Sequence, residues 1–280
     1  MPRATKKGTR LSSVANALRL IKAFSDEEYE IGISGLAKRL GLAKSTVHRL
    51  ASTLLEEGML EQNGEGKYRL GLALFEVGAL VRRRMDFTAE ARPYLRALMA
   101  KTGETVHLAV LDRGSVLYII THESRQAIRM GGHVGTRAPV HSTAVGKVLL
   151  AFQPEEVVGR VVARGLPAST PNTITDARAL RRELAAVRSR GYAVDDEESE
   201  LGLRSIAAPI KNDAGGVVAS ISIAGPVHRV AKKALLGWSR ELVDAADAIS
   251  QRLGWTEPRR VSTQATHRGR GLAAPAPISA

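Results

Sequence analysis

The sequence of 280 residues contains no cysteine. This absence excludes disulfides, thiolate catalysis and cysteine-ligated zinc together. The chain also has no uninterrupted run of about 18–20 apolar residues, which a membrane-spanning helix requires. Its basic beginning does not lead into the apolar core and cleavage site of a secretory signal. These absences predict a globular protein of the cytoplasm with no membrane partner.

Motifs of several enzyme classes are missing as well. Segment 141–147, HSTAVGK, would be a phosphate-binding loop only with glycine at 141 and serine or threonine at 148. No Gly-x-Ser-x-Gly motif marks a hydrolase nucleophile. His107 and His122 are placed to face each other across a hairpin, and we interpret them as structural residues rather than zinc ligands. We therefore expect a protein that is not an enzyme and that uses no metal and no cofactor.

Positive charge is concentrated toward the two ends of the chain. The net charge is +13, and residues 1–85 hold 15 lysines and arginines against 9 acidic residues. Residues 86–255 hold 22 against 18, and residues 256–280 hold 4 against 1. Such ends suit a polyanion, because neutralised phosphates release condensed counterions. A basic surface that serves solubility explains the charge equally well.

The pattern along the chain changes character several times. A disordered basic arm is predicted for 1–10, and a disordered tail for 256–280. Residues 11–71 form a run of short helical segments that ends in a hairpin, and 72–88 read as a connector helix. Residues 89–255 alternate strand pairs with helices.

Residues 11–71 show the pattern of a winged helix-turn-helix. Apolar residues at helical spacing predict three helices: one with Val14, Leu18 and Ile21, one after Ser34, and one over about 44–57 that Gly58 ends. Between the second and third helices, the small Ala37 lets the two approach, and Gly41 supplies the positive φ of a tight turn.

The third of these helices has a polar outer face. Val47, Leu50 and Leu54 point to the core. Side chains that hydrogen-bond to base edges and phosphates occupy the outer face and first turn, namely Lys44, Ser45, Thr46, His48, Arg49 and Ser52. We predict that they read DNA. A helix-turn-helix used only for protein contacts is the alternative.

A hairpin follows this helix in the position of a wing. Segments 59–62 and 67–70 flank the glycine-rich turn 63–66. Lys67 and Arg69 lie on its second strand, and we expect them to contact the DNA backbone. Together with the basic arm, the wing favours DNA binding over protein contacts alone.

The second half of the chain predicts strand pairs and helices. The strands are 105–111 with 115–120, and 206–211 with 217–223, and Pro209 indicates an edge or a bulge. One helix carries Leu180, Leu184 and Val187 and ends at Gly191, and a long terminal helix runs from Leu235 to Leu253. This half is an α+β arrangement.

Four segments carry a resemblance to a known family. They are LAKRLGLAKSTVHRLASTLLEEGMLEQ followed by YRLG, VGTRAPVHSTAVGKVLLA (134–151), RGYAVDDEESELGLRSIAAPI (190–210) and GGVVASISIAGP (215–226). In this order they resemble the IclR family of bacterial transcriptional regulators, from Ser13 to Gly254. The resemblance implies an α+β chain with a winged helix-turn-helix and a GAF-like effector domain. It also implies homodimers or homotetramers that repress or activate genes at double-stranded DNA operators.

Pocket residues follow partly from the sequence and partly from the resemblance. Residues 141–147 begin a helix whose free N–H groups at Ala144 and Val145 would bind an anionic ligand, and an ordinary capped helix is the alternative. The resemblance places this segment at the effector pocket and implies that Asp195, Ser205 and Ser222 contact the effector. Read on their own, the four acids at 195–198 indicate a solvated loop. We expect the effector to be a small carboxylate or an aromatic acid.

The sequence therefore predicts a transcriptional regulator whose operator binding responds to a small molecule. One alternative is an enzyme fused to a DNA-binding module, and another is a constitutive DNA-binding protein whose second domain only oligomerises. Three residues depart from the family pattern: Ser205 replaces a cysteine found in many relatives, Ala224 replaces a hydroxyl found in some, and Ala43 stands where many members have serine or proline. Loss of that helix cap costs about 1 kcal/mol unless a neighbour compensates.

Overall fold

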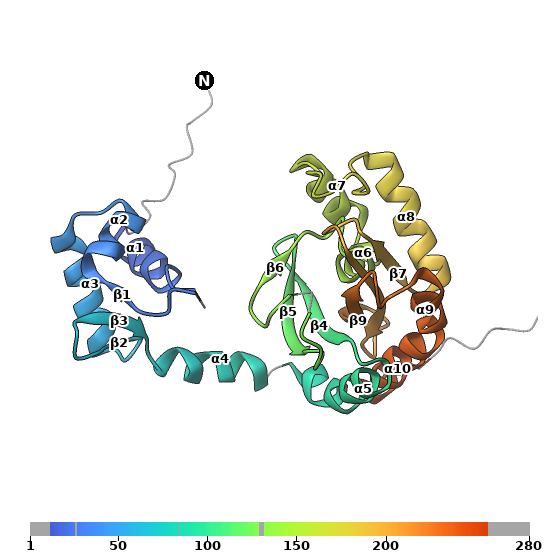
Figure 1. Cartoon of the computed structure of the whole chain (residues 1–280), viewed down its shortest axis with the longest axis horizontal. Coiled ribbons are helices and arrows are strands. Elements are labelled where there is room, and N and C mark those ends of the chain that lie inside the picture. The colour runs from blue at the N-terminus through green and yellow to red at the C-terminus, as the bar shows by residue number, and fades with distance from the viewer. Residues whose placement is uncertain (1–11, 26, 84, 129–131, 257–280) are drawn as a thin grey trace, which may run out of the picture. The chain divides into compact units, whose positions relative to one another are not determined.

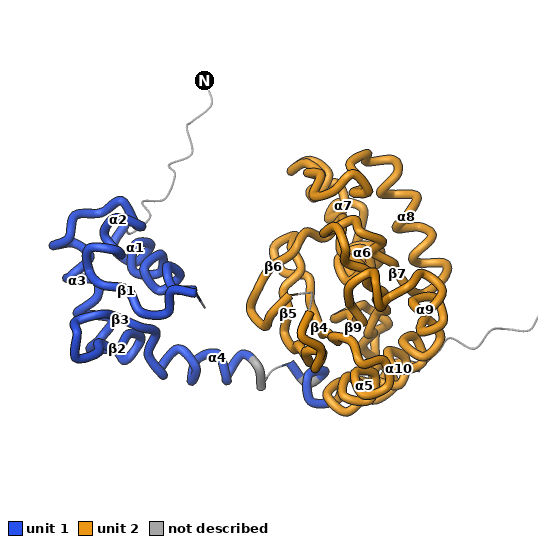
Figure 2. Tube along the Cα trace, in the orientation of Figure 1, with its two compact units in different colours: residues 1–89 blue, residues 90–280 orange. Residues whose placement is uncertain are grey.

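A computed structural model describes residues 12–25, 27–83, 85–128 and 132–256. The predicted arm and all but the first residue of the predicted tail lie outside these ranges. The chain divides into two compact units, residues 1–89 and 90–280 (Figure 2).

The first unit is a helix-turn-helix with a small sheet. Its elements are α1 (Ser12–Ile21), β1 (Ile31–Gly32), α2 (Ile33–Leu40), α3 (Lys44–Glu56), β2 (Leu60–Gln62), β3 (Lys67–Leu70) and α4 (Ala73–Arg83) (Figure 1). The strands pair antiparallel in the order β1-β3-β2. The three predicted helices and the hairpin are confirmed. The two-residue β1 was not predicted, because so short a strand carries no alternating pattern.

The turn between α2 and α3 has the predicted chemistry. Gly41 ends α2 with φ of 67°, and its N–H donates to the carbonyls of Ala37 and Lys38. Ala37 is buried, and so is Val47 of α3, so the two helices pack closely here. The same turn leaves the outer side of α3 facing solvent.

The segment after the hairpin differs from the single connector helix expected over 72–88. The chain forms two helices, α4 and then α5 (Asp86–Thr102). Leu95 and Leu98 in α5 are buried at helical spacing, so this helix continues into the core of the second unit. Helical periodicity alone does not show where one helix ends and the next, which packs into another core, begins.

The second unit is built on one antiparallel sheet, which has six strands among the described residues. Their order is β6-β5-β4-β9-β8-β7. The strands are β4 (Thr105–Asp112), β5 (Ser115–His122), β6 (Arg137–Ala138), β7 (Ala193–Asp196), β8 (Leu203–Lys211) and β9 (Val217–Pro226). The helices after α5 are α6 (Ala144–Ala151), α7 (Glu155–Ala163), α8 (Ala177–Arg190), α9 (Lys232–Gly237) and α10 (Ser239–Arg252). The predicted α+β class is confirmed.

Helices cover both faces of this sheet. Figure 1 shows α6 and α8 on one side and α5 and α10 on the other. Neighbouring residues of one strand therefore point into different layers, as Leu108 and Ala109 do, and both are fully buried. This explains why β4 reads as a nearly continuous apolar run.

Two details of the second unit test the sequence predictions. Pro209 lies beyond the part of β8 that pairs with β7, next to a bulge at Ile210/Lys211, as predicted. The prediction of one long terminal helix is wrong, because α9 ends at Gly237 and α10 begins at Ser239. Glycine weakens a helix interior by about 1 kcal/mol relative to alanine, and it stands at the break.

Candidate nucleic-acid interface and pocket

The outer face of α3 presents the predicted polar set. Lys44, Ser45, Thr46, His48 and Arg49 are exposed, and Ser52 is partly exposed. Val47, Ala51 and Leu54 hold the opposite face in the core. Lys44 and Arg49 form no ion pair with any residue that the structure describes. Both cations are therefore available to phosphates or base edges.

The start of α3 lacks a side-chain cap. Ala43 is the N-cap residue, and no side chain accepts a hydrogen bond there. Ser45 lies in the first turn and does not replace the cap. The free N–H groups of this turn are available to an anion such as a DNA phosphate.

The two predicted wing cations are already paired. Lys67 Nζ lies 2.9 Å from Glu65 Oε2. The Arg69 guanidinium donates to Glu61 Oε2 from Nε at 2.9 Å and from Nη2 at 2.8 Å. Contact with phosphate would require these exposed pairs to open, which costs little because such pairs contribute about 0–1 kcal/mol. The hairpin thus offers DNA weaker electrostatic attraction than α3 does.

Helix α4 carries an apolar surface that remains exposed among the described residues of its unit. Phe75 is 66% exposed, Leu80 57% and Val81 56%. Large apolar side chains gathered on one exposed helix are typical of protein contact surfaces.

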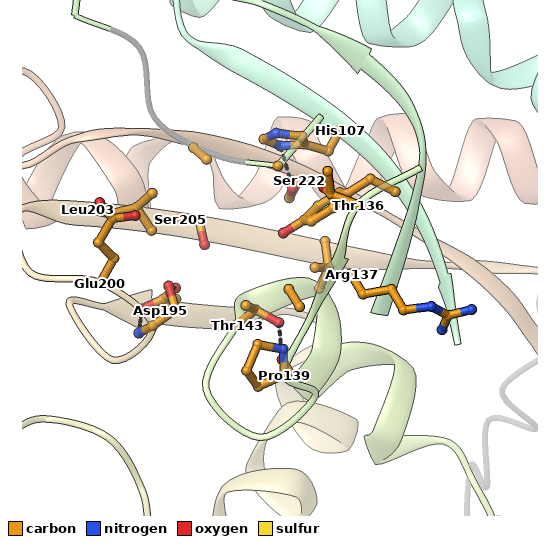
Figure 3. A pocket seen from close by; sticks show the side chains of 16 residues that line it. His107, Thr136, Arg137, Pro139, Thr143, Asp195, Glu200, Leu203, Ser205 and Ser222 are labelled. Atoms are coloured by element: carbon orange, nitrogen blue, oxygen red, sulfur yellow. Dashed lines mark hydrogen bonds between the residues drawn. The ribbon is translucent and has the colours of Figure 1, made fainter. Parts of the chain in front are cut away.

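The second unit contains a partly open cavity of about 220 Å³. Its walls come from the sheet, from the beginning of α6 and from the loop between β7 and β8 (Figure 3). Val145, Asp195, Ser205 and Ser222 line it, so four of the five predicted effector residues come together. Ala144 does not line it, because successive helical residues point about 100° apart and its side chain packs into the core.

Helix α6 begins at the cavity with a side-chain cap. Thr143 Oγ1 accepts from the Gly146 N–H at 3.1 Å and donates to the Pro139 carbonyl at 2.7 Å. The cap leaves the N–H groups of Ala144 and Val145 without an acceptor among the described residues. A capped helix and an anion-attracting helix end are thus compatible here.

The acidic run is not the solvated loop that its composition indicated. Asp195 is fully buried and Glu198 is 9% exposed. Asp195 Oδ1 accepts from the amides of Glu198 at 2.8 Å and Ser199 at 3.2 Å, and its other oxygen accepts from the Ser199 hydroxyl. The carboxylate of Asp195 can be buried because backbone and hydroxyl donors replace the water that it loses.

The two middle acids of the run are paired as well. Asp196 binds Arg204 and Lys232, each at 2.6 Å. Glu197 accepts from the Gly202 amide at 2.9 Å. Each of the four acids therefore has a partner inside the protein.

Burial changes the pKa values of the first and last acids of the run, Asp195 and Glu198. It raises the pKa of Asp195 in spite of the donors from Ser199 and Glu198. It raises the pKa of Glu198 to about 7, and the Lys147 ammonium beside it offsets only part of the effect.

The two histidines of the first hairpin do not face each other. His107 pairs with Thr121 and His122 with Val106, so their side chains lie on opposite faces of the sheet. His107 lines the cavity, where burial lowers its pKa to about 4 and keeps the ring neutral. Its Nδ1 atom lies 3.4 Å from Ser222 Oγ. The ring is a wall of the cavity rather than half of a zinc site.

The charged residues at the cavity include no free cation among those described. Arg137 donates to the carbonyl oxygen and carboxylate of Asp112, and its guanidinium points away from the other labelled side chains (Figure 3). The remaining charged residues of the lining are Asp195 and Glu200. Backbone N–H groups and hydroxyls therefore supply the donors for a ligand.

Two features are absent from the part of the chain that the structure describes. None of their helices is long and apolar enough to cross a bilayer. No three of their histidine, aspartate and glutamate side chains are grouped so that they could hold a metal ion.

Comparison with known proteins accounts for nearly the whole described chain. The profile of the IclR helix-turn-helix domain matches residues 13–64, and that of the bacterial transcriptional regulator IclR C-terminal domain matches residues 79–251. HTH-type transcriptional regulator KdgR of Escherichia coli is 39% identical over 253 residues, which cover 89% of this chain and 95% of KdgR. Transcriptional repressor IclR of Escherichia coli is 34% identical over 249 residues, covering 88% and 91%.

Solved structures show the same similarity. IclR of Thermotoga maritima is 33% identical with a TM-score of 0.74, covering 87% of this chain and 99% of that one. An IclR homolog from Microbacterium hydrocarbonoxydans, solved in complex with 4-hydroxybenzoate, is 29% identical with a TM-score of 0.78, covering 86% and 98%.

Proposed function

The chain belongs to the IclR family of bacterial transcriptional regulators and is a DNA-binding regulator rather than an enzyme, and we propose that a small molecule bound in the cavity of residues 90–280 controls its binding to operator DNA. The observation that carries the proposal is the cavity lining, because four of the five residues expected to contact an effector belong to it. A domain that only oligomerises has no need of such a space.

The proposed DNA contacts centre on α3. Its six outer residues read base edges and phosphates, and Arg49 makes the main base contact because its guanidinium is exposed and free of ion pairs among the described residues. Lys67 and Arg69 contribute to backbone contacts after releasing Glu65 and Glu61. The cytoplasm is the proposed location, since the operator lies there.

The proposed effector is a small carboxylate or an aromatic acid. Its carboxylate would accept from the N–H groups of Ala144 and Val145, and hydroxyls of Ser205 and Ser222 would bind its polar substituents. Asp195 contacts substituents that donate a hydrogen bond. The relative solved with 4-hydroxybenzoate supports this class of ligand.

The proposed assembly is a homodimer or homotetramer. The support is the exposed apolar surface of α4, which includes Phe75, Leu80 and Val81. Burying it against the same surface of a second copy would remove it from water.

A gel-shift experiment tests the proposal. The purified full-length protein is titrated onto the intergenic DNA upstream of its own gene at about 0.15 M salt with excess competitor DNA, since only the specific excess over counterion-driven binding is informative. Acetate, pyruvate, gluconate and 4-hydroxybenzoate are then added in turn. We expect one of these classes to weaken or strengthen a discrete complex. A specific complex that none of them changes would favour the constitutive DNA-binding alternative.

A further inference from the structure

A fully enclosed lysine lies beneath the cavity of the second unit. Lys147 is on α6 and is 1% exposed. Its ammonium group binds Glu198 Oε1 and lies 3.9 Å from Glu183 Oε1 of α8. Glu183 is also bound by Arg190 at 2.6 Å, so Glu198 is the principal partner of Lys147. Lysine is rarely buried without a specific partner.

The ion pair joins the two walls of the cavity. Lys147 follows Thr143 and Val145 by one turn or less, and both of those residues line the cavity. Glu198 belongs to the loop between β7 and β8, which supplies Ser199 and Glu200 to another wall, next to Asp195 at the end of β7. Neither Lys147 nor Glu198 is among the described residues that line the space.

The backbone carries this link to Asp195. The amide of Glu198 donates to Asp195 Oδ1 at 2.8 Å, so Glu198 is bonded to Lys147 through its side chain and to the cavity wall through its N–H. On the other side of the loop, the Thr173 hydroxyl donates to the Glu198 carbonyl at 2.6 Å. Moving the carboxylate of Glu198 would therefore move the segment that positions Asp195.

Stability alone does not explain the pair. A buried ion pair contributes little net stability, and apolar replacements of similar volume are often neutral or stabilising. Glu198 Oε2 has no hydrogen-bond partner among the described residues, which adds to its cost. What an apolar pair would not supply is a directional bond between α6 and the loop.

We propose that Lys147 and Glu198 are positioning residues for the effector cavity: their ion pair fixes the segment 195–200 relative to the start of α6 and so sets effector affinity without touching the effector. The inference rests on the proposed function, because it assigns regulation to the same cavity. A positioning role differs from a purely structural role in one respect. Loss of the pair should lower ligand affinity without a matching loss of stability.

The experiment uses three variants of the full-length chain: Lys147→Met, Glu198→Gln and the double variant. Leu242→Ala is the matched control, since Leu242 is fully buried in α10 and does not line the cavity. Thermal unfolding gives Tm, hydrogen exchange gives the protection of residues 193–203, and calorimetry gives Kd for 4-hydroxybenzoate and pyruvate. Should a single variant fail to fold, the double variant, which leaves no unpaired buried charge, is the test.

The expected results separate position from stability. In the double variant we expect Tm to return toward wild type, while residues 193–203 exchange faster than in wild type and Kd rises about tenfold, the lower end of the effect that outer-shell changes have on affinity at metal sites. Leu242→Ala should lower Tm without raising Kd. A double variant with wild-type exchange and wild-type Kd would overturn the proposal.

The exchange measurement also keeps the two proposals apart. If neither probe binds the wild-type protein, the proposed effector class fails for these compounds. Protection of residues 193–203 then still decides the positioning role, because it requires no ligand.

Discussion

Replacing Glu198 by glutamine should change how stability depends on pH. In the folded protein burial raises the pKa of Glu198 from 4.5 to about 7. A carboxyl group whose pKa is raised by folding binds its proton more tightly in the folded state. Its stabilising contribution is therefore complete below pH 4.5 and is lost as the pH rises toward 7.

The size of the effect follows from the two pKa values. A difference of this size corresponds to about 3 kcal/mol of unfolding free energy. Glutamine is neutral at every pH and has nearly the shape of the protonated acid. The stability of the variant relative to wild type should therefore be lowest at pH 5 and should rise by up to about 3 kcal/mol toward pH 8.

A second buried group makes the comparison with a variant necessary. Burial lowers the pKa of His107 from 6.5 to about 4, so its effect has the opposite sign, and stability is lost as the pH falls from 6.5 toward 4. In wild type the two slopes oppose each other between about pH 4.5 and 6.5. Subtracting the variant's curve from that of wild type removes the histidine contribution and leaves that of Glu198.

Urea unfolding at half-unit steps from pH 5 to 8, followed by circular dichroism, measures the difference. Glu200→Gln is the control, since it makes the same change at an exposed site of the same loop and should run parallel to wild type. Parallel curves for Glu198→Gln and wild type would refute the reasoning, because they would mean that Glu198 titrates alike in the folded and unfolded chain.

Three further predictions concern the first unit. Arg49→Ala should weaken operator binding by about tenfold or more in gel shifts, whereas Arg182→Ala, which removes the same charge from the exposed side of α8, should not; equal losses would contradict the recognition role of α3. Ala43→Ser should raise the unfolding free energy by about 1 kcal/mol in urea melts by capping α3, and an unchanged value would mean that this helix end is already satisfied. Leu80→Glu in α4 should shift sedimentation toward a smaller species, and an unchanged oligomer would place the interface elsewhere.

The sequence predicted the elements whose signals are local. Gly41 and Gly191 take the positive φ that their places after helices indicated, and the wing forms around its glycine-rich turn. Helical periodicity was less reliable at helix junctions. It joined α9 to α10 across Gly237, because an isolated glycine within a periodic pattern does not show whether the helix continues.

The feature that was hardest to predict is the burial of acidic residues in the run 195–198. Four consecutive acids normally indicate solvent, because a charge is costly to bury. The partners that make burial possible are distant in sequence: Lys147 is 51 residues from Glu198, and Thr173 is 25 residues from it. A local pattern holds no information on such pairings. The sequence did contain one signal, which is the lysine within the apolar helix 144–151. All residues of this helix are buried, so the ammonium group of Lys147 requires a buried carboxylate as its partner. A single charged residue within an apolar helix is thus a good predictor of a buried ion pair. A run of like charges is a poorer predictor of solvent exposure.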